Sequence, residues 1–377
     1  MNKKEHIEPW KIDLDRYTMD FLNGLSGFCG ALLSTLNGLE SAMRQFHPPN
    51  LPKIQAALRP FEQRLKAARI IFEQDILSSG TDRVTDQLLK VTAAADRCLD
   101  YFLGAEQPQT AIGQIMKAMR QLYRAQEYLY PLIEGLKPVG RYFLEAPLRD
   151  RLADYKTPLQ DSSKAGLYLS QGDETTGEYC FYVPETYTAN SAWPLVVALH
   201  GGSGSGRDFI WLWLREARSR RFLLAAPSSA GRTWSFDSPV DAKGISAMID
   251  TLSEKWRVDR TRILLTGCSD GAIYTLTCGL QKNSPFTALA PISGVLHPID
   301  LTFAGQKRIY LVHGTLDWMF SVQYAHQSFA RLKTAGAEVE FRELTDLSHT
   351  YPREENDLIL SWFDPALSIG KKQSTNR

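Results

Sequence analysis

Residues 264–274 read LLTGCSDGAIY, an apolar run that is interrupted by one serine between two glycines. The segment RILLTG before the serine has a strand pattern, and AIYTLTCGLQ after it has a helix pattern. The five residues at the junction, Gly267 to Gly271, fit the G-x-S-x-G pattern of a sharp strand-to-helix turn. Bulky side chains at either glycine would collide with the sheet or the adjacent helix. The pattern therefore predicts that Ser269 is presented on a strained turn as a candidate nucleophile.

The sequence around this turn, from residue 165 to 365, alternates short apolar runs with helical stretches. Continuous apolar runs are typical of parallel strands that are covered on both faces by helices. The alternation predicts a mostly parallel α/β sheet with right-handed crossovers. The expected strands are GLYLS, YCFYVP, PLVVALH, RFLLAAP, RILLTG, ALAPIS, RIYLVHG and EVEFREL, and the expected helices lie around 206–219, 240–257, 270–281, 322–335 and 353–363.

The first part of the chain, residues 16 to 153, has apolar positions at helical spacing and almost no strand pattern. Its connections are short and rich in helix breakers, which predicts antiparallel neighbouring helices. We therefore expect two domains, a helical bundle over residues 1–155 and an α/β domain over residues 156–377. In the first helix, a stripe of small residues fits either tight packing inside the bundle or a surface for homo-oligomer formation. These residues are Gly24, Gly27, Ala31, Ser34 and Gly38.

The composition is that of an ordinary soluble protein, with 44% hydrophobic and 23% charged residues. A net charge of +1 gives no electrostatic reason to expect nucleic acid as a partner. The five cysteines lack CxxC or His/Cys spacing, so no metal site is expected. The charged N-terminus and the polar residues within the apolar stretch 21–39 argue against a signal peptide and a membrane span, so we expect a cytoplasmic location.

Two further segments supply the partners that a serine nucleophile needs. Where this turn occurs, the acid and the base follow the serine in the order Ser, Asp, His. Asp317 follows the expected strand RIYLVHG, and His349 lies in the loop LTDLSHTYP ahead of the last helix. His297 is the main rival to His349, but it precedes Asp317 and breaks this order. We therefore predict that Ser269, Asp317 and His349 are the catalytic residues.

Five segments, YCFYVPETY, WPLVVALHGG, GCSDGA, HGTLD and the final SH, together resemble the α/β-hydrolase superfamily. Within it, they are similar to the esterase group that includes polyhydroxybutyrate-depolymerase-like, feruloyl-esterase-like and phospholipase/carboxylesterase-like proteins. The resemblance covers about residues 165–365 and implies an α/β-hydrolase fold with serine esterase activity. It also implies an oxyanion hole formed by the backbone N–H groups of Gly202 and Asp270. An aspartate after the nucleophile departs from the small or apolar residues common at that position.

No cofactor is expected, because the sequence carries no transition-metal or dinucleotide signature. The glycine-rich loop GGSGSG is followed by Arg207 and lacks the lysine of a phosphate-binding loop. A nucleotide site is therefore not expected in this loop.

These residues predict a serine hydrolase that cleaves small-molecule carboxylic esters with short or medium acyl or aryl groups through an acyl-enzyme intermediate. Trp234 and Trp318 lie in expected loops on the catalytic side and are candidate substrate-binding residues. Two alternatives stay open. One is a peptidase or thioesterase that uses the same three residues, and the other is a partner-binding scaffold whose hydrolase domain is vestigial.

Overall fold

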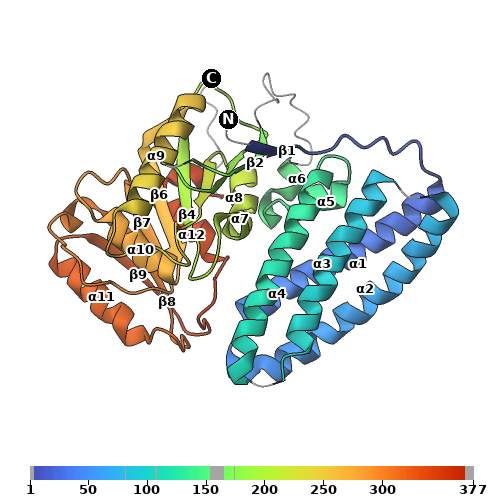
Figure 1. Ribbon diagram of the computed structural model, residues 1–377, viewed down its shortest axis with the longest axis horizontal. Coiled ribbons are helices and arrows are strands. Elements are labelled where there is room, and N and C mark those ends of the chain that lie inside the picture. The colour runs from blue at the N-terminus through green and yellow to red at the C-terminus, as the bar shows by residue number, and fades with distance from the viewer. Residues whose placement is uncertain (1–3, 81, 107, 153–164, 174, 370–377) are drawn as a thin grey trace. The chain divides into compact units, whose positions relative to one another are not determined.

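The computed structural model describes residues 4–80, 82–106, 108–152, 165–173 and 175–369 (Figure 1). The chain divides into two compact units. The helical unit is Glu8–Phe143, and the sheet unit combines Met1–Ile7 with Leu144–Arg377. The predicted domain boundary between residues 155 and 156 falls within 153–164, which lie outside the described residues. The assignment of residues 1–7 to the sheet unit was not expected, and it follows from a strand at that end of the chain.

Among the described residues, the helical unit consists mainly of four long helices, which can be followed in Figure 1. They are α1 Met19–Arg44, α2 Leu51–Ser79, α3 Arg83–Leu103 and α4 Pro108–Leu129, and a short helix, α5 Lys137–Tyr142, follows. The helix starts follow from local sequence, because Thr18 accepts from the Phe21 N–H at α1 and Asp82 forms a capping box with Thr85 at α3. The predicted helical character of this part of the chain is confirmed. Among the described residues, no helix is long and apolar enough to cross a membrane.

The apolar stripes of these helices are buried within the unit. Phe28 of α1 stacks on Phe72 of α2 with 4.3 Å between ring centroids, and both rings are fully buried. The small residues of α1 differ in their surroundings. A Cβ at Gly38 would lie 3.0 Å from the Phe61 ring, whereas nothing lies within 4 Å of a Cβ at Gly27. Close packing therefore explains Gly38 and does not explain Gly27.

The sheet unit is built on nine strands in the order β1-β2-β3-β5-β4-β6-β7-β8-β9. The pairs from β5 to β9 in this order are parallel, and the pairs among β1, β2, β3 and β5 are antiparallel. The eight strands that the apolar runs predict are confirmed. The nine strands are β1 Lys4–Ile7, β2 Gly166–Ser170, β3 Tyr179–Val183, β4 Trp193–Leu199, β5 Leu223–Pro227, β6 Val258–Cys268, β7 Ala288–Ile292, β8 Arg308–Gly314 and β9 Glu338–Leu344.

Strand β1 was not expected from the sequence. Its register with β2 pairs Lys4 with Ser170 and Ile7 with Leu167. The His6 ring stacks on Tyr168 with 4.2 Å between centroids, and its Nε2 lies 2.9 Å from the Ala165 carbonyl oxygen. Four residues that include a lysine and a glutamate give no apolar strand pattern. The helical unit is therefore an insertion between the first and second strands of the sheet.

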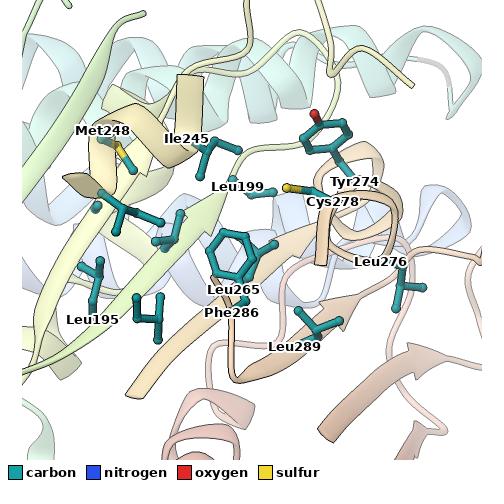
Figure 2. Close-up of a cluster of buried hydrophobic side chains, with 14 of the residues drawn as sticks. Leu195, Leu199, Ile245, Met248, Leu265, Tyr274, Leu276, Cys278, Phe286 and Leu289 are labelled. Atoms are coloured by element: carbon teal, nitrogen blue, oxygen red, sulfur yellow. The ribbon is translucent and has the colours of Figure 1, made fainter. Parts of the chain in front are cut away.

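Helices cover both faces of the sheet. The helices of this unit are α6 Arg149–Leu152, α7 Gly206–Phe209, α8 Leu214–Ser219, α9 Val240–Lys255, α10 Asp270–Gly279, α11 Val322–Thr334 and α12 Glu355–Phe363. Figure 2 shows one core cluster, in which Leu199 of β4 and Leu265 of β6 lie with Met248 of α9 and Leu276 of α10. Tyr310 of β8 alternates with strand residues of this cluster and contacts Trp362, so α12 covers the opposite face.

The strand order places two loops side by side. The chain runs from β4 to β5 on one side and then passes β4 to form β6 on the other side. The carboxyl ends of β4 and β6 are therefore neighbours, and ligands of open α/β sheets bind where the strand order reverses in this way. The loop that begins at His200 follows β4, and Ser269 follows β6.

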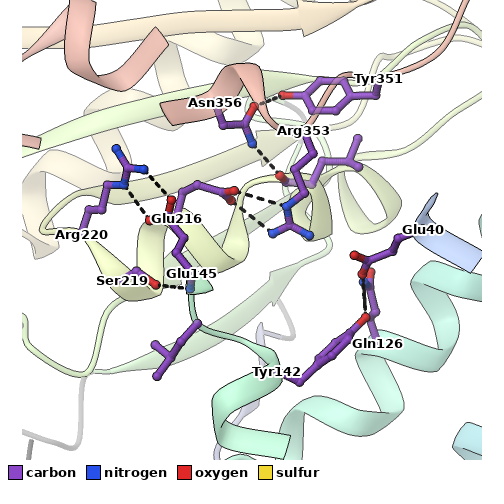
Figure 3. A network of polar contacts seen from close by, with 12 residues as sticks. Glu40, Gln126, Tyr142, Glu145, Glu216, Ser219, Arg220, Tyr351, Arg353 and Asn356 are labelled. Atoms are coloured by element: carbon purple, nitrogen blue, oxygen red, sulfur yellow. Dashed lines mark hydrogen bonds and ion pairs between the residues drawn. The ribbon is translucent and has the colours of Figure 1, made fainter. Parts of the chain in front are cut away.

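A polar network links α8 to the segments that follow α5 and β9 (Figure 3). Arg220 is almost fully buried, pairs with Glu145 and donates to the Leu367 carbonyl. Arg353 donates to both carboxylate oxygens of the buried Glu216, each at 3.2 Å. Because Arg353 lies in the same loop as His349, this second pair anchors the loop that carries the predicted base.

Candidate active site

Ser269 lies on the turn between β6 and α10 in a conformation that L-residues rarely adopt, with φ 57° and ψ −122°. The flanking glycines explain how the turn fits. A Cβ at Gly271 would lie 2.4 Å from the Leu199 carbonyl oxygen, and one at Gly267 would lie 2.4 Å from the Gly271 carbonyl oxygen. The backbone strain at the serine and the need for both glycines agree with the predicted strand-to-helix turn.

The structure brings the three predicted residues together in one row of hydrogen bonds. His349 Nε2 lies 2.9 Å from Ser269 Oγ, and His349 Nδ1 lies 2.8 Å from Asp317 Oδ2. An ionised carboxylate can only accept, so Nδ1 carries the proton of a neutral imidazole. Nε2 then has a free lone pair, which faces the hydroxyl of the serine. This arrangement can withdraw a proton from Ser269.

Asp317 is held in place by its own loop. Its Oδ1 accepts from the N–H groups of Met319 at 2.9 Å and Phe320 at 2.8 Å. The fully buried His313 also contacts this loop. Its Nε2 lies 2.7 Å from the Phe320 carbonyl oxygen and 3.5 Å from Asp317 Oδ2. The carboxylate therefore presents one oxygen to His349 while the other is bound to backbone. The sequence signalled His313 only as a histidine before a glycine at a strand end.

Aromatic rings flank the His349 imidazole. Trp318 and Phe320 both approach it edge-on, with centroid distances of 5.7 Å and 5.5 Å. Leu316 and Met319, in the same loop, are 40% and 48% exposed. An apolar surface therefore lies beside the three hydrogen-bonded side chains. Trp318, a predicted substrate-binding residue, lies within this surface.

The prediction that Trp234 lines a substrate pocket is wrong. Its indole is only 2% exposed, stacks on Tyr274 and donates from Nε1 to the His200 carbonyl at 2.8 Å. Burial in the core leaves no face of the ring for a ligand. The rival histidine, His297, stacks on Phe236 and takes no part in the hydrogen bonds of Asp317.

The two predicted oxyanion donors lie on the loops after β4 and β6. Asp270 is the first residue of α10, where backbone N–H groups lack helical acceptors and the helix dipole favours negative charge. A Cβ at Gly202 would lie 2.6 Å from Asp270 Oδ2, so the two residues are in contact. Within the described part of the chain, neither N–H donates to a protein acceptor.

Cys268, next to the serine, is not suited to act as a nucleophile. Desolvation, with smaller effects of the Asp317 and Asp270 carboxylates, raises the pKa of this thiol to about 12. The thiolate is the reactive form of cysteine, and it does not accumulate at neutral pH with such a pKa. Among the described residues, no group of three or more His, Cys, Asp or Glu side chains could hold a metal ion.

The sheet, the strained serine turn and the Ser269, His349 and Asp317 geometry define the sheet unit as an α/β-hydrolase. Within that class, residues 233–363 match the sequence model of the family described as phospholipase/carboxylesterase. The match supports the esterase group of the α/β-hydrolases that the resemblance implied for this unit.

Several known proteins are similar to parts of the chain. A bifunctional acetylxylan esterase/xylanase of Neocallimastix patriciarum is 27% identical over 184 residues, which is 46% of this chain and 26% of that protein. A probable feruloyl esterase C of Aspergillus terreus is 25% identical over 126 residues, which is 31% of this chain and 46% of that protein. A solved structure of a thermostable esterase is 21% identical, with a TM-score of 0.45, and covers 54% of this chain and 63% of that one. The chain spans less than half the length of each of these two sequence relatives.

Proposed function

We propose that the protein is a serine hydrolase that cleaves small-molecule carboxylic esters with Ser269, His349 and Asp317 as its catalytic residues. The observation that carries the proposal is the unbroken row of hydrogen bonds from Ser269 Oγ to the Asp317 carboxylate. The match of residues 233–363 to the phospholipase/carboxylesterase family and the two esterases among its sequence relatives support the ester as substrate.

The proposed reaction has two steps. His349 Nε2 accepts the Ser269 proton while Oγ attacks the ester carbonyl, and the protonated imidazole then passes the proton to the leaving alcohol. Asp317 keeps Nδ1 protonated and stabilises the imidazolium that forms. Water, activated by the same histidine, then releases the acid from the acyl-enzyme. Neither of these two reaction steps uses a metal or a cofactor.

The negative charge on the carbonyl oxygen needs donors during both steps. We assign this task to the backbone N–H groups of Gly202 and Asp270, which have no acceptor in the described part of the chain. The N-terminal end of α10 adds a favourable dipole at the same place.

The acyl or aryl group of the substrate would lie against the apolar surface beside His349. Trp318, Met319 and Leu316 offer this surface, and the last two are both exposed in the loop that carries Asp317. This favours an apolar acyl or aryl ester of short or medium length. A peptidase or thioesterase would use the same three residues in the same geometry. Only tests with different substrates distinguish these activities from an esterase.

The test is hydrolysis of p-nitrophenyl acetate, butyrate, octanoate and benzoate, together with labelling by a fluorophosphonate. We expect turnover by the wild type, labelling at Ser269, and a loss of kcat of at least about 10³-fold in Ser269→Ala and His349→Ala. His297→Ala is the matched histidine control and should keep its activity.

A wild type that neither labels nor turns over any ester would refute the proposal and favour a scaffold with a vestigial hydrolase unit. Labelling without ester turnover, combined with cleavage of an aminoacyl anilide or an acyl thioester, would instead assign the same residues to a peptidase or thioesterase.

A further inference from the structure

The carboxylate of Asp270 has no task in the proposed reaction, which uses only the backbone N–H of this residue. Its side chain nevertheless has a specific partner. Asp270 Oδ2 accepts from the Thr233 hydroxyl at 2.6 Å, a short distance that is typical of a hydrogen bond to an ionised acceptor. Both residues are partly buried. The contact therefore joins the start of α10 to the segment after β5.

The same carboxylate lies against the loop that carries the other N–H donor. The Asp270 side chain fills the position that a side chain at Gly202 would take. A Cβ at Gly202 would lie 2.6 Å from Asp270 Oδ2 and 3.4 Å from its Cγ. Real Cβ atoms essentially never lie within 3.0 Å of another atom, so the 2.6 Å separation leaves no room for a side chain at Gly202. The residue that offers one donor thus packs its side chain directly on the residue that offers the other.

The segment that contains Thr233 also holds this loop by hydrogen bonds to the backbone of the loop. We call residues 229–235 the bracing segment. Within it, the Arg232 carbonyl accepts from Ser203 N–H at 2.8 Å, and Trp234 Nε1 donates to the His200 carbonyl at 2.8 Å. Ser203 has φ 59°, so this part of the loop is held in a conformation that it would not adopt unaided.

The bracing segment is itself held in place by a residue of α9. The buried Asp241, at the start of α9, accepts from the Ala230 N–H with Oδ1 and from the Ser235 N–H with Oδ2, both at 2.7 Å. A carboxylate bound at both oxygens by backbone leaves the segment little freedom. Thr233, between these two anchor points, is therefore a rigid donor for Asp270.

We propose that Asp270 and Thr233 are positioning residues that set the spacing of the two oxyanion donors. The Thr233 to Asp270 hydrogen bond ties the nucleophile turn to the bracing segment, which holds the Gly202 loop. This inference rests on the proposed function. Because the donors act on charge that develops in the transition state, their misplacement lowers kcat and leaves KM nearly unchanged.

The test compares Thr233→Val, which removes the hydroxyl at nearly constant volume, with Thr233→Ser, which keeps it. Rates on p-nitrophenyl butyrate are divided by the concentration of sites that a fluorophosphonate titrates, so that misfolded protein does not count. We expect Thr233→Val to lower kcat about 10- to 100-fold with KM within about twofold, since loss of a whole donor costs about 10²- to 10³-fold. Thr233→Ser should keep most of the activity.

Two further variants make the comparison specific. Thr302→Val removes a Thr to Asp hydrogen bond of the same length, 2.6 Å to Asp300, at an exposed position, and should leave kcat unchanged. Asp270→Asn keeps an acceptor without the charge and should fall between the wild type and Thr233→Val. Asp270→Asn also weakens the Thr233 to Asp270 hydrogen bond by a second route, which is needed if Thr233→Val fails to fold.

A boronic acid inhibitor gives a readout that general destabilisation would not move. It forms a tetrahedral adduct with the serine, so its affinity should fall in Thr233→Val by about the same factor as kcat. Unchanged kcat per titrated site in both Thr233→Val and Asp270→Asn would overturn the inference while the wild-type activity still supports the proposed function. A wild type without Ser269-dependent turnover would refute the proposed function itself.

Discussion

At the scale of single residues, the loop after β4 contains a histidine whose hydrogen bonds favour one protonation state. This residue is His200. Its Nε2 accepts from the Ser229 N–H at 3.0 Å, so Nδ1 carries the proton and donates to the Gly201 carbonyl at 2.7 Å. A second proton would have to displace the Ser229 N–H. In agreement, burial lowers the pKa of His200 below its ordinary value.

This lowered pKa predicts a loss of stability in mild acid. Below pH of about 6.5 the unfolded chain protonates His200 while the folded chain does not, so the free energy of unfolding decreases as pH falls. The slope from this group is at most about 1.4 kcal/mol per pH unit and ends at the folded-state pKa. Urea unfolding at pH 7.5, 6.0 and 5.0 measures it.

The control is His200→Gln, whose amide can accept the same hydrogen bond and does not titrate in this range. The stability gap between the wild type and this variant should narrow as the pH falls. Parallel pH curves for the two proteins would show that His200 is not responsible.

Single residues also show what could and could not be predicted from the sequence. The proximity of Ser269, Asp317 and His349 was predictable, because a local pattern and a chain order single them out without knowledge of packing. Trp234 was not, since only the tertiary structure shows that its indole is enclosed by Tyr274 and His200. The Thr233 to Asp270 contact spans 37 positions and has no sequence pattern.

At the scale of secondary structure elements, the junction of β6 and α10 depends on the absence of a side chain at Gly271. A Cβ there would meet the carbonyl oxygens of Leu199 at 2.4 Å and His200 at 2.5 Å, both of them backbone atoms of β4 and its loop. Backbone cannot rotate away as a side chain can. Relief of the clash therefore requires α10 to move, together with Ser269.

We predict that Gly271→Ala destabilises the protein by about 1–3 kcal/mol, as overpacking does, and lowers kcat severely. A misplacement of about 1 Å can cost about 10²-fold in rate. Thermal unfolding and p-nitrophenyl butyrate hydrolysis measure the two effects.

The matched control is Gly27→Ala in α1. Nothing lies within 4 Å of a Cβ at this exposed helical position. Alanine should therefore stabilise the helical unit by about 0.5–1 kcal/mol, and ester hydrolysis should not change. Equal effects of the two substitutions on activity would contradict the geometric argument. Homo-oligomer formation through the small residues of α1 stays a prediction.

The elements themselves were largely predictable, because apolar runs in the sheet and apolar spacing in the helices are local signals. Strand β1 was the exception. Its residues KEHI are polar enough for a loop, and only their pairing with β2 makes them a strand. Edge strands have one unpaired side and often carry charged side chains, so they lack the apolar signature of central strands.

At the scale of the whole molecule, the helical unit is inserted between β1 and β2. Two deletions of this unit, one that keeps β1 and one that removes it, should therefore differ in stability. Replacing Glu8–Phe143 by a flexible linker keeps β1 and should leave a folded sheet unit with Ser269-dependent activity. Starting the chain at Leu144 removes β1 and exposes the edge of β2, which should lower thermal stability and promote aggregation.

Thermal unfolding, size-exclusion chromatography and ester hydrolysis compare the two proteins. Equal stability of both would show that β1 contributes nothing to the sheet. A change of acyl preference in the linker variant would show that the helical unit influences substrate choice.

The position of β1 also has a consequence for folding. His6 and Ala165 are in contact although 159 positions separate them, and closing so long a loop carries a large entropic cost and slows pairing. The helical unit can shorten this loop, because within it the Trp10 N–H donates to the Pro131 carbonyl. Once that unit has folded, the number of residues in the effective loop between β1 and β2 is much smaller. The folded helical unit thereby lowers the entropic cost of pairing a strand of only four residues with the sheet.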